Sequence, residues 1–220
     1  MCGIISYIGK SDTTSILLRG LKRLEYRGYD SAGVALLNGK NLNYIKGAGK
    51  VAGLLGKING SLVKGSCGIA HTRWATHGEP NDINAHPHLD KTGKIALVHN
   101  GIIENYQAIK KTLISRGVSF TSNTDSEVLV QLISELYYNN EEKLNFEDSV
   151  KAALQEIVGA YGIVVICSDE PDTMVAARMG SPLVLGVGEE EFLIASDASP
   201  IIEYTRNVIY LDDGEFVKIH

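Results

Sequence analysis

A series of short apolar segments separated by turn residues fills the C-terminal part of the chain and most constrains its fold. Turn signals such as Ser199-Pro200 and Asp212-Asp213-Gly214 lie between these segments. Short connections favour antiparallel pairing, because parallel strands need a crossover of roughly a dozen residues or more. Strands are therefore expected at residues 163–167, 173–177, 183–187, 192–195, 207–211 and 215–219.

The N-terminal part adds helices and further strands to this pattern. About four helices and ten or so strands predict one α+β domain over residues 1–220, with mainly antiparallel sheets. Strands are expected at residues 4–9, at 34–37 and 42–45 around the turn Asn38-Gly39, at 67–70 and at 94–99. Helices are expected after the cap residue Asp12, over 106–117, from the capping box Thr124-Asp125-Ser126-Glu127 to about 138, and over 146–158.

Composition excludes several classes of partner. Lys and Arg total 21 and Asp and Glu 26, so the net charge of −5 argues against nucleic acid and anionic membranes. No apolar run approaches the ~20 residues that span a bilayer, and the short apolar stretch after Met1 does not resemble a signal peptide. Cys2, Cys67 and Cys167 are too few and too widely spaced for a disulfide framework. A soluble, cytoplasmic protein is expected.

The second residue combines two reactive groups if Met1 is removed. Cys2 would then hold a thiol and a free α-amine, and its small side chain suits aminopeptidase processing. The α-amine titrates at about 7.7–8.0 and a thiol at about 8.5, so the amine can accept the thiol proton near neutral pH. The alternative is that Cys2 is a small buried residue at the start of a strand.

Two polar segments contain further candidate residues. The segment from His71 to His88 has no helical or strand periodicity and holds the one tryptophan, Trp74, with four of the six histidines. A long loop of this kind in a compact domain is usually functional or disordered. Asn100-Gly101 falls between an expected strand and an expected helix, and a strand-to-helix turn there offers backbone N–H groups to an anion.

These residues together suit acyl transfer on an amino-acid substrate. The Asn100 amide and the Gly101 N–H are candidate donors to a developing oxyanion, with a simple turn as the alternative. Arg73 suits a carboxylate, because its fork binds two oxygens, and otherwise is a surface charge. Asp125 suits an ammonium group, although it could simply favour the helix dipole.

Nucleotide and metal sites are poorly supported. Residues 47–52 fit G-x-G-x-x-A, but the next strand lacks the acidic residue, and no Ser or Thr follows Gly49-Lys50. The histidines at 71, 77, 86, 88 and 99 could form a metal site, yet there is no HExxH and no Cys/His finger spacing. We expect no metal and no cofactor.

Several ordered motifs resemble the class II glutamine amidotransferases, which belong to the N-terminal-nucleophile hydrolases. The resemblance covers essentially the whole chain. The sequence of residues 26–31 resembles that of the glucosamine-6-phosphate synthase branch of the family. The motifs that carry it are Cys2-Gly3-Ile4, residues 23–33, residues 71–80, residues 84–88, His99-Asn100-Gly101 and Thr124-Asp125.

The resemblance implies a fold and a site. The fold would be a four-layer αββα sandwich. Exposed Cys2 would attack the side-chain amide of L-glutamine to form a γ-glutamyl thioester, releasing ammonia and then glutamate. The remaining roles would fall to Asn100 and Gly101 (oxyanion hole), Arg73 (α-carboxylate), Asp125 (α-amine), Thr76 and His77 (pocket wall) and Trp74 (the loop closing over glutamine).

The family also implies partner domains that these 220 residues lack. In the synthases, two sugar-isomerase domains that bind fructose 6-phosphate follow the glutaminase domain. The chain is therefore expected to hydrolyse glutamine but not to make glucosamine 6-phosphate by itself. The alternatives are the glutaminase domain of another class II amidotransferase and a silent glutaminase-like regulatory module.

Overall fold

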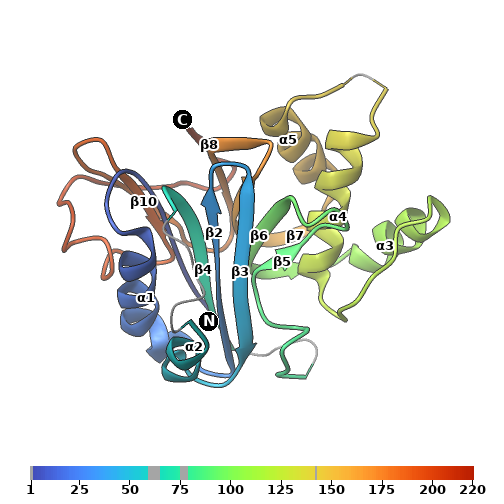
Figure 1. Ribbon diagram of the computed structural model, residues 1–220. Helices are drawn as coiled ribbons and strands as arrows, with labels where there is room; N and C mark the ends of the chain where they lie inside the picture. Colours follow the sequence, from blue (N-terminus) through green and yellow to red (C-terminus); the bar gives the residue numbers. More distant parts are fainter. Residues whose placement is uncertain (1, 59–64, 75–78, 142) are drawn as a thin grey trace.

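Two antiparallel sheets stack between two layers of helices in the computed structural model (Figure 1). The structure describes residues 2–58, 65–74, 79–141 and 143–220, and within these ranges it has five α-helices and twelve strands. In Figure 1 the first two helices lie at the left, the other three at the right, and the strands between them. The αββα expectation is thus confirmed.

The larger sheet has seven strands, and it contains the strand that follows Cys2. Their order is β11-β9-β10-β1-β4-β2-β3, every pair being antiparallel. The strands are β1 (Gly3–Ile8), β2 (Ser31–Asn38), β3 (Asn41–Ala48), β4 (Cys67–Arg73), β9 (Val184–Val187), β10 (Phe192–Ala195) and β11 (Val208–Tyr210).

The smaller sheet has five strands in the order β12-β8-β7-β6-β5, again all antiparallel. It contains the Asn100-Gly101 dipeptide. The strands are β5 (His88–Leu89), β6 (Ile95–Ile103), β7 (Gly159–Cys167), β8 (Glu170–Met179) and β12 (Phe216–Ile219).

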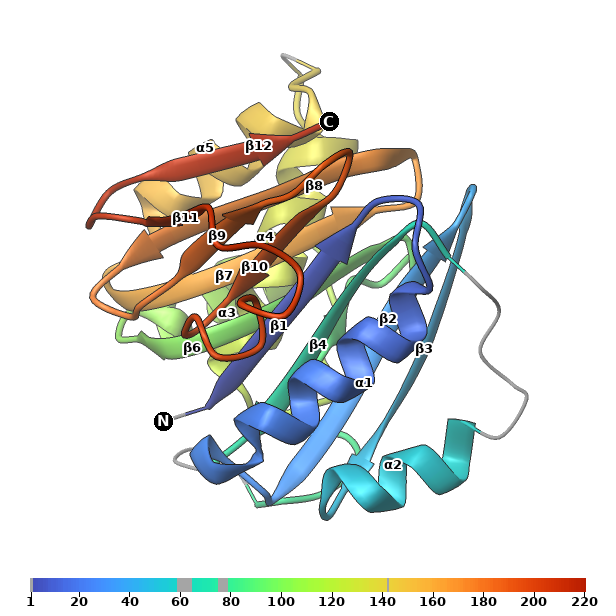
Figure 2. The same ribbon diagram turned by 90° about the vertical axis from the view of Figure 1, so that its left-hand side faces the viewer.

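Alternation along the strands produces three apolar layers. On β1, Ile4 packs into the layer between the two sheets, and its neighbour Ile5 packs into the layer under the first helices. Helices α1 (Thr13–Leu24) and α2 (Val51–Ile58) cover the outer face of the larger sheet (Figure 2). Helices α3 (Tyr106–Ser115), α4 (Asp125–Tyr138) and α5 (Phe146–Glu156) cover the smaller sheet.

Capping residues explain where the helices begin and end. Asp12 accepts a hydrogen bond from the Ser15 N–H at the start of α1, at 3.3 Å. Thr124 accepts from the Glu127 N–H at the start of α4, at 3.2 Å, as the capping box predicts. Gly117 follows α3 with φ at +86°, a conformation that favours glycine after a helix.

Three expectations about local structure were wrong. Helix α2 was missed, because it has only eight residues and contains Gly53 and Gly56. The polar residues 71–73 belong to β4, since all three pair with β2 and the first two also pair with β1, which holds them extended. Asn100-Gly101 lies inside β6, paired with β7, rather than on a strand-to-helix turn.

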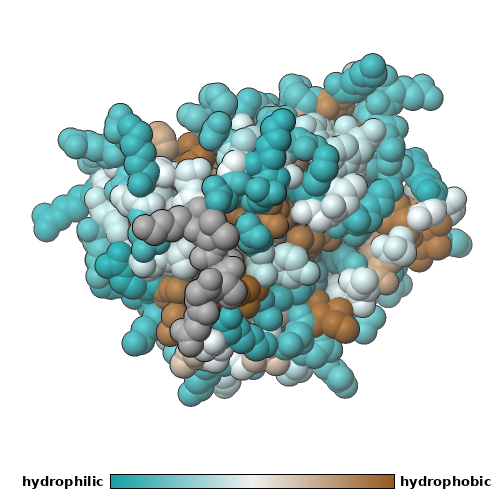
Figure 3. Space-filling view, in the orientation of Figure 1, coloured by the Kyte–Doolittle hydropathy of each residue, from teal (hydrophilic) through white to brown (hydrophobic). Residues whose placement is uncertain are grey.

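Figure 3 shows one face of the molecule, on which hydrophilic side chains predominate and hydrophobic ones form separate patches. Within the described ranges, no helix has the length and apolar composition needed to cross a bilayer.

Candidate active site

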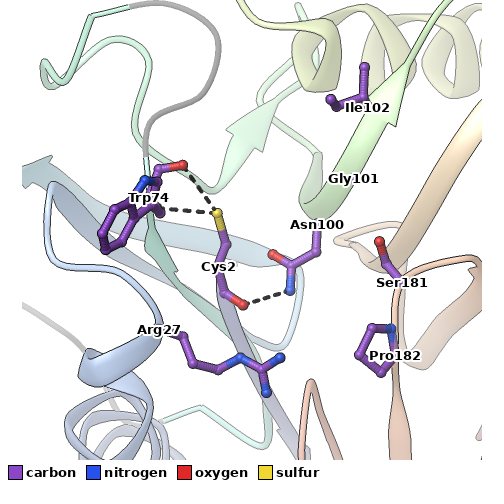
Figure 4. A pocket seen from close by; sticks show the side chains of 8 residues that line it. All are labelled: Cys2, Arg27, Trp74, Asn100, Gly101, Ile102, Ser181 and Pro182. Carbon is purple, nitrogen blue, oxygen red and sulfur yellow. Dashed lines mark hydrogen bonds between the residues drawn. The ribbon is translucent and has the colours of Figure 1, made fainter.

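Cys2 precedes β1, the central strand of the larger sheet, and lies half-buried beside the end of β4. Its Sγ accepts a hydrogen bond from the Trp74 N–H at 3.2 Å (Figure 4). The pairing of Gly3 with Thr72 sets this contact, because it aligns the start of β1 with the end of β4. Burial raises the pKa of the Cys2 thiol, while the Trp74 N–H and the Arg73 charge act in the opposite direction. These two groups stabilise the thiolate, which is the nucleophilic form.

The Asn100 side chain reaches Cys2 from the smaller sheet. Its Nδ2 donates to the Cys2 carbonyl oxygen at 3.0 Å (Figure 4). Its Oδ1 lies 3.0 Å from Nε2 of His71. The side chain is therefore held at both ends, with its amide N–H groups beside the nucleophile. A fixed donor at this place suits an oxyanion hole.

Gly101 occupies a position that only glycine tolerates. Its φ is +133°, and a Cβ built there would lie 2.0 Å from the Ala160 carbonyl oxygen across the sheet. Backbone strain of this kind clusters at functional sites. The glycine therefore lets β6 take a conformation beside Cys2 that other residues could not adopt.

Opposite charges line one small cavity next to Cys2. Arg73 is the last residue of β4 and Asp125 the first of α4, and both border a cavity of about 40 Å³ with Cys2, Trp74 and Gly101. Burial lowers the pKa of Arg73, and the nearby charges of Cys2, Asp30 and Asp125 oppose this shift. One Asp125 oxygen accepts from the Ile103 N–H at 2.8 Å, which fixes the carboxylate.

A second cavity, of about 210 Å³, opens on the other side of Cys2. It is lined by Cys2, Arg27, Trp74, Asn100, Gly101, Ile102, Ser181 and Pro182 (Figure 4). Arg27 donates to Asp197 at 2.7 Å. Burial raises the pKa of Asp197, but hydrogen bonds from Ser199, Tyr26 and Arg27 outweigh it and bring the pKa to about 2.

Of the eight residues expected at the site, the structure brings six together. Cys2, Trp74 and Gly101 border both cavities, Asn100 borders the larger, and Arg73 and Asp125 border the smaller. The other two, Thr76 and His77, lie outside the described residues, as does Met1. The Trp74 ring is half-exposed and stands edge-on to Tyr29, with centroids 5.5 Å apart.

Sequence reasoning missed several lining residues. Arg27 and His86 both lie in segments that were singled out as motifs, yet neither was assigned to the site. Ser181 and Pro182 follow β8, far along the chain from every motif, and no local signal marks them. Their place at the larger cavity depends on how the two sheets stack.

Four of the histidines do cluster, but without the geometry of a metal site. The rings of His71 and His86 stack at 4.1 Å, and His88 stands edge-on to His86 at 4.6 Å. Burial lowers the pKa of all four, the fourth being His99, so they are neutral. In the part of the chain that the structure describes, no three His, Cys, Asp or Glu residues are arranged to hold a metal ion.

Comparison with known proteins decides the family. The family described as "Glutamine amidotransferase domain" matches residues 71–203, more than half of the chain. The chain belongs to the glutamine amidotransferase domain family. This match includes five of the six site residues placed above, all but Cys2.

Relatives of this glutamine amidotransferase domain are found at high identity. It is 55% identical over 222 aligned positions to the glutamine–fructose-6-phosphate aminotransferase (isomerizing) of Chlorobaculum tepidum. It is 52% identical over 221 positions to the protein of that name from Bacteroides thetaiotaomicron. Each alignment covers 100% of this chain but 36% of the relative, so the chain spans about a third of those proteins.

Two solved structures share the fold of this glutamine amidotransferase domain. The glutamine phosphoribosylpyrophosphate amidotransferase of B. subtilis, complexed with ADP and GMP, has a TM-score of 0.83 at 27% identity. The match covers 99% of this chain and 47% of that one. A second structure, described as the allosteric regulatory enzyme of purine biosynthesis, has a TM-score of 0.86 at 27% identity, covering 99% and 46%. The class II amidotransferase fold is thereby shown.

Proposed function

We propose that this domain hydrolyses L-glutamine to glutamate and ammonia through a γ-glutamyl thioester on Cys2, once Met1 is removed. One arrangement carries the proposal. Cys2 borders the cavity that Arg73 and Asp125 line with opposite charges, and its carbonyl accepts from Asn100 at 3.0 Å. A nucleophile, an oxyanion donor and two groups suited to an α-amino acid thus converge on one place.

The chemistry begins at the thiol. The free α-amine of processed Cys2 takes the thiol proton, directly or through water, and Sγ bonds to the δ-carbon of glutamine. Negative charge then develops on the amide oxygen, and we assign its stabilisation to the Asn100 side-chain N–H and the Gly101 N–H, because both residues line the cavity with Cys2. The proton returns to the leaving nitrogen as the C–N bond breaks, and ammonia departs. Water then cleaves the thioester, which releases glutamate and restores the thiol.

Substrate recognition follows from the two charges. The Arg73 guanidinium offers a fork to the α-carboxylate, and the Asp125 carboxylate attracts the α-ammonium. Trp74 lies between the two cavities, because it borders both of them. We assign the pocket wall to Thr76 and His77 together with Trp74, on the resemblance of residues 71–80 to the family motif.

The relatives suggest the biological context of this activity. Their name, glutamine–fructose-6-phosphate aminotransferase, describes transfer of the glutamine nitrogen to fructose 6-phosphate. We propose that residues 1–220 form one glutaminase domain, and that its ammonia serves glucosamine 6-phosphate synthesis on sugar-isomerase domains.

Arg73→Lys tests the recognition step. Lys keeps the charge but loses the two-pronged fork, so we expect the KM for glutamine to rise about 10²-fold while kcat falls less. The measurement is steady-state glutamate release over a range of glutamine concentrations. Asp125→Asn, which removes the charge facing the ammonium, should also raise KM.

Arg19→Lys is the matched control, because Arg19 is an exposed residue of α1 whose Nε donates to the Ser15 carbonyl. Its kinetics should equal those of the unmodified domain. A normal KM in both site variants would contradict glutamine as the substrate of this cavity.

A further inference from the structure

The nucleophile and the oxyanion donor belong to different sheets. Cys2 precedes β1 of the seven-stranded sheet, whereas Asn100 lies on β6 of the five-stranded sheet. Their relative position therefore depends on contacts that cross between the sheets. An oxyanion donor must be placed to within a fraction of an ångström, so these contacts bear directly on catalysis.

His71 makes such a contact from the centre of the larger sheet. It lies on β4 opposite Ile4 of β1 and is fully buried. Its Nε2 lies 3.0 Å from Oδ1 of Asn100 and 3.2 Å from the carbonyl oxygen of His99, both on β6. One ring nitrogen of the larger sheet thus contacts two consecutive residues of the smaller one.

The partners of this nitrogen settle where its proton lies. A carbonyl oxygen can only accept, so Nε2 of His71 carries the hydrogen and donates to the His99 carbonyl and to Asn100 Oδ1. Nδ1 is then the unprotonated nitrogen. Burial lowers the pKa of His71 to about 3, so the neutral ring keeps this form throughout the working pH range.

This proton in turn orients the Asn100 amide. Because His71 donates, the group facing it must be the amide oxygen, which leaves Nδ2 to face Cys2, where it donates to the backbone carbonyl. With the amide turned by 180°, an oxygen would face the developing oxyanion and repel it. The contact therefore selects the catalytically useful orientation.

We propose that His71 is a positioning residue, which holds the Asn100 amide with its N–H groups toward the substrate oxygen. The proposal rests on the glutaminase function inferred above. His71 acts through Asn100 and across the sheet interface, and it does not itself contact the reacting atoms.

Three substitutions at one position test the role. His71→Phe keeps a ring that can stack on His86 but has no donor, and we expect kcat to fall about 10–100-fold with KM within about threefold. His71→Gln can place an N–H near the position of Nε2, and its kcat should stay within about fivefold of the unmodified domain. His71→Asn has the same amide on a shorter chain that reaches only the Nδ1 position, so it should resemble Phe.

A control on the same strand separates positioning from stability. Cys67→Ala removes a buried group at the opposite end of β4, so it should lower Tm and leave kcat unchanged. Tm and glutamate release are measured for all variants. A fall in kcat that merely follows Tm across this set would overturn the proposal.

The remaining outcomes are also decisive. Normal kcat in a folded Phe variant, or a Gln variant as slow as Phe, would overturn the proposal. If His71→Phe does not fold, the comparison of His71→Gln with His71→Asn tests the proposal instead. Equal kcat values for these two variants would overturn the proposal. Absence of glutamate release from the processed, unsubstituted domain would instead refute the proposed function.

Discussion

Replacing Cys2 by Ala is expected to abolish glutamate release, with kcat reduced by at least about 10⁴-fold. The thiol forms the bond that creates the thioester, and no other cysteine can substitute for it. Cys67 and Cys167 are both buried in strands, and burial raises the pKa of each thiol. Glutamate formed from saturating glutamine is the measurement.

The matched control is Cys67→Ala, which changes the same side chain at a place remote from both cavities. It should keep the kcat of the unmodified domain. Cys2 is half-buried and its Sγ hydrogen-bonds with the Trp74 backbone, so Cys2→Ala should retain the fold by circular dichroism. Substantial turnover by a folded Cys2→Ala protein would rule out the thioester route.

Replacing Asn100 by Ala should lower kcat by about 10²–10³-fold, the usual effect of losing one oxyanion donor. KM should change little, because the Arg73 and Asp125 charges that suit the α-groups of glutamine remain in place. Asn100→Ala should thus mainly lower kcat, whereas Arg73→Lys should mainly raise KM. Steady-state kinetics of the two variants side by side separate the roles.

Asn41→Ala provides the comparison for this second result. Asn41 is an exposed asparagine at the start of β3. It lies at the opposite end of that strand from Ala48, which pairs with Ser31. Its removal should alter neither kcat nor KM. If Asn100→Ala retains more than about a third of normal kcat, the amide is not an oxyanion donor.

The fold was largely predictable where local signals agree with tertiary packing. The capping box at Thr124 and the turn at Asn38-Gly39 each fix an element boundary by local chemistry, and both predictions are confirmed. The stacking of the two sheets could not be predicted from local signals. Composition and periodicity indicate antiparallel sheets, whereas the four-layer arrangement was expected only from the family resemblance.

The site shows where local reasoning fails. His71 to Arg73 are too polar to suggest a strand, yet they lie in β4, because all three pair with β2 and the first two also pair with β1. Asn100-Gly101 was expected on a turn, because the dipeptide usually marks one. The dipeptide instead lies within a paired strand beside Cys2, where the glycine has a positive φ. The six described candidate residues lie together around Cys2, but the secondary structure expected for residues 71–73 and 100–101 was wrong.

Intact mass spectrometry before and after treatment with a glutamine-mimicking diazoketone tests the central claim most directly. We predict a chain lighter by one methionine, which gains a single adduct that peptide mapping assigns to Cys2. The adduct should fail to form in Cys2→Ala and should form more slowly when glutamine competes. A folded chain that has lost Met1 and yet gains no adduct at Cys2 would contradict the claim that Cys2 is the activated nucleophile.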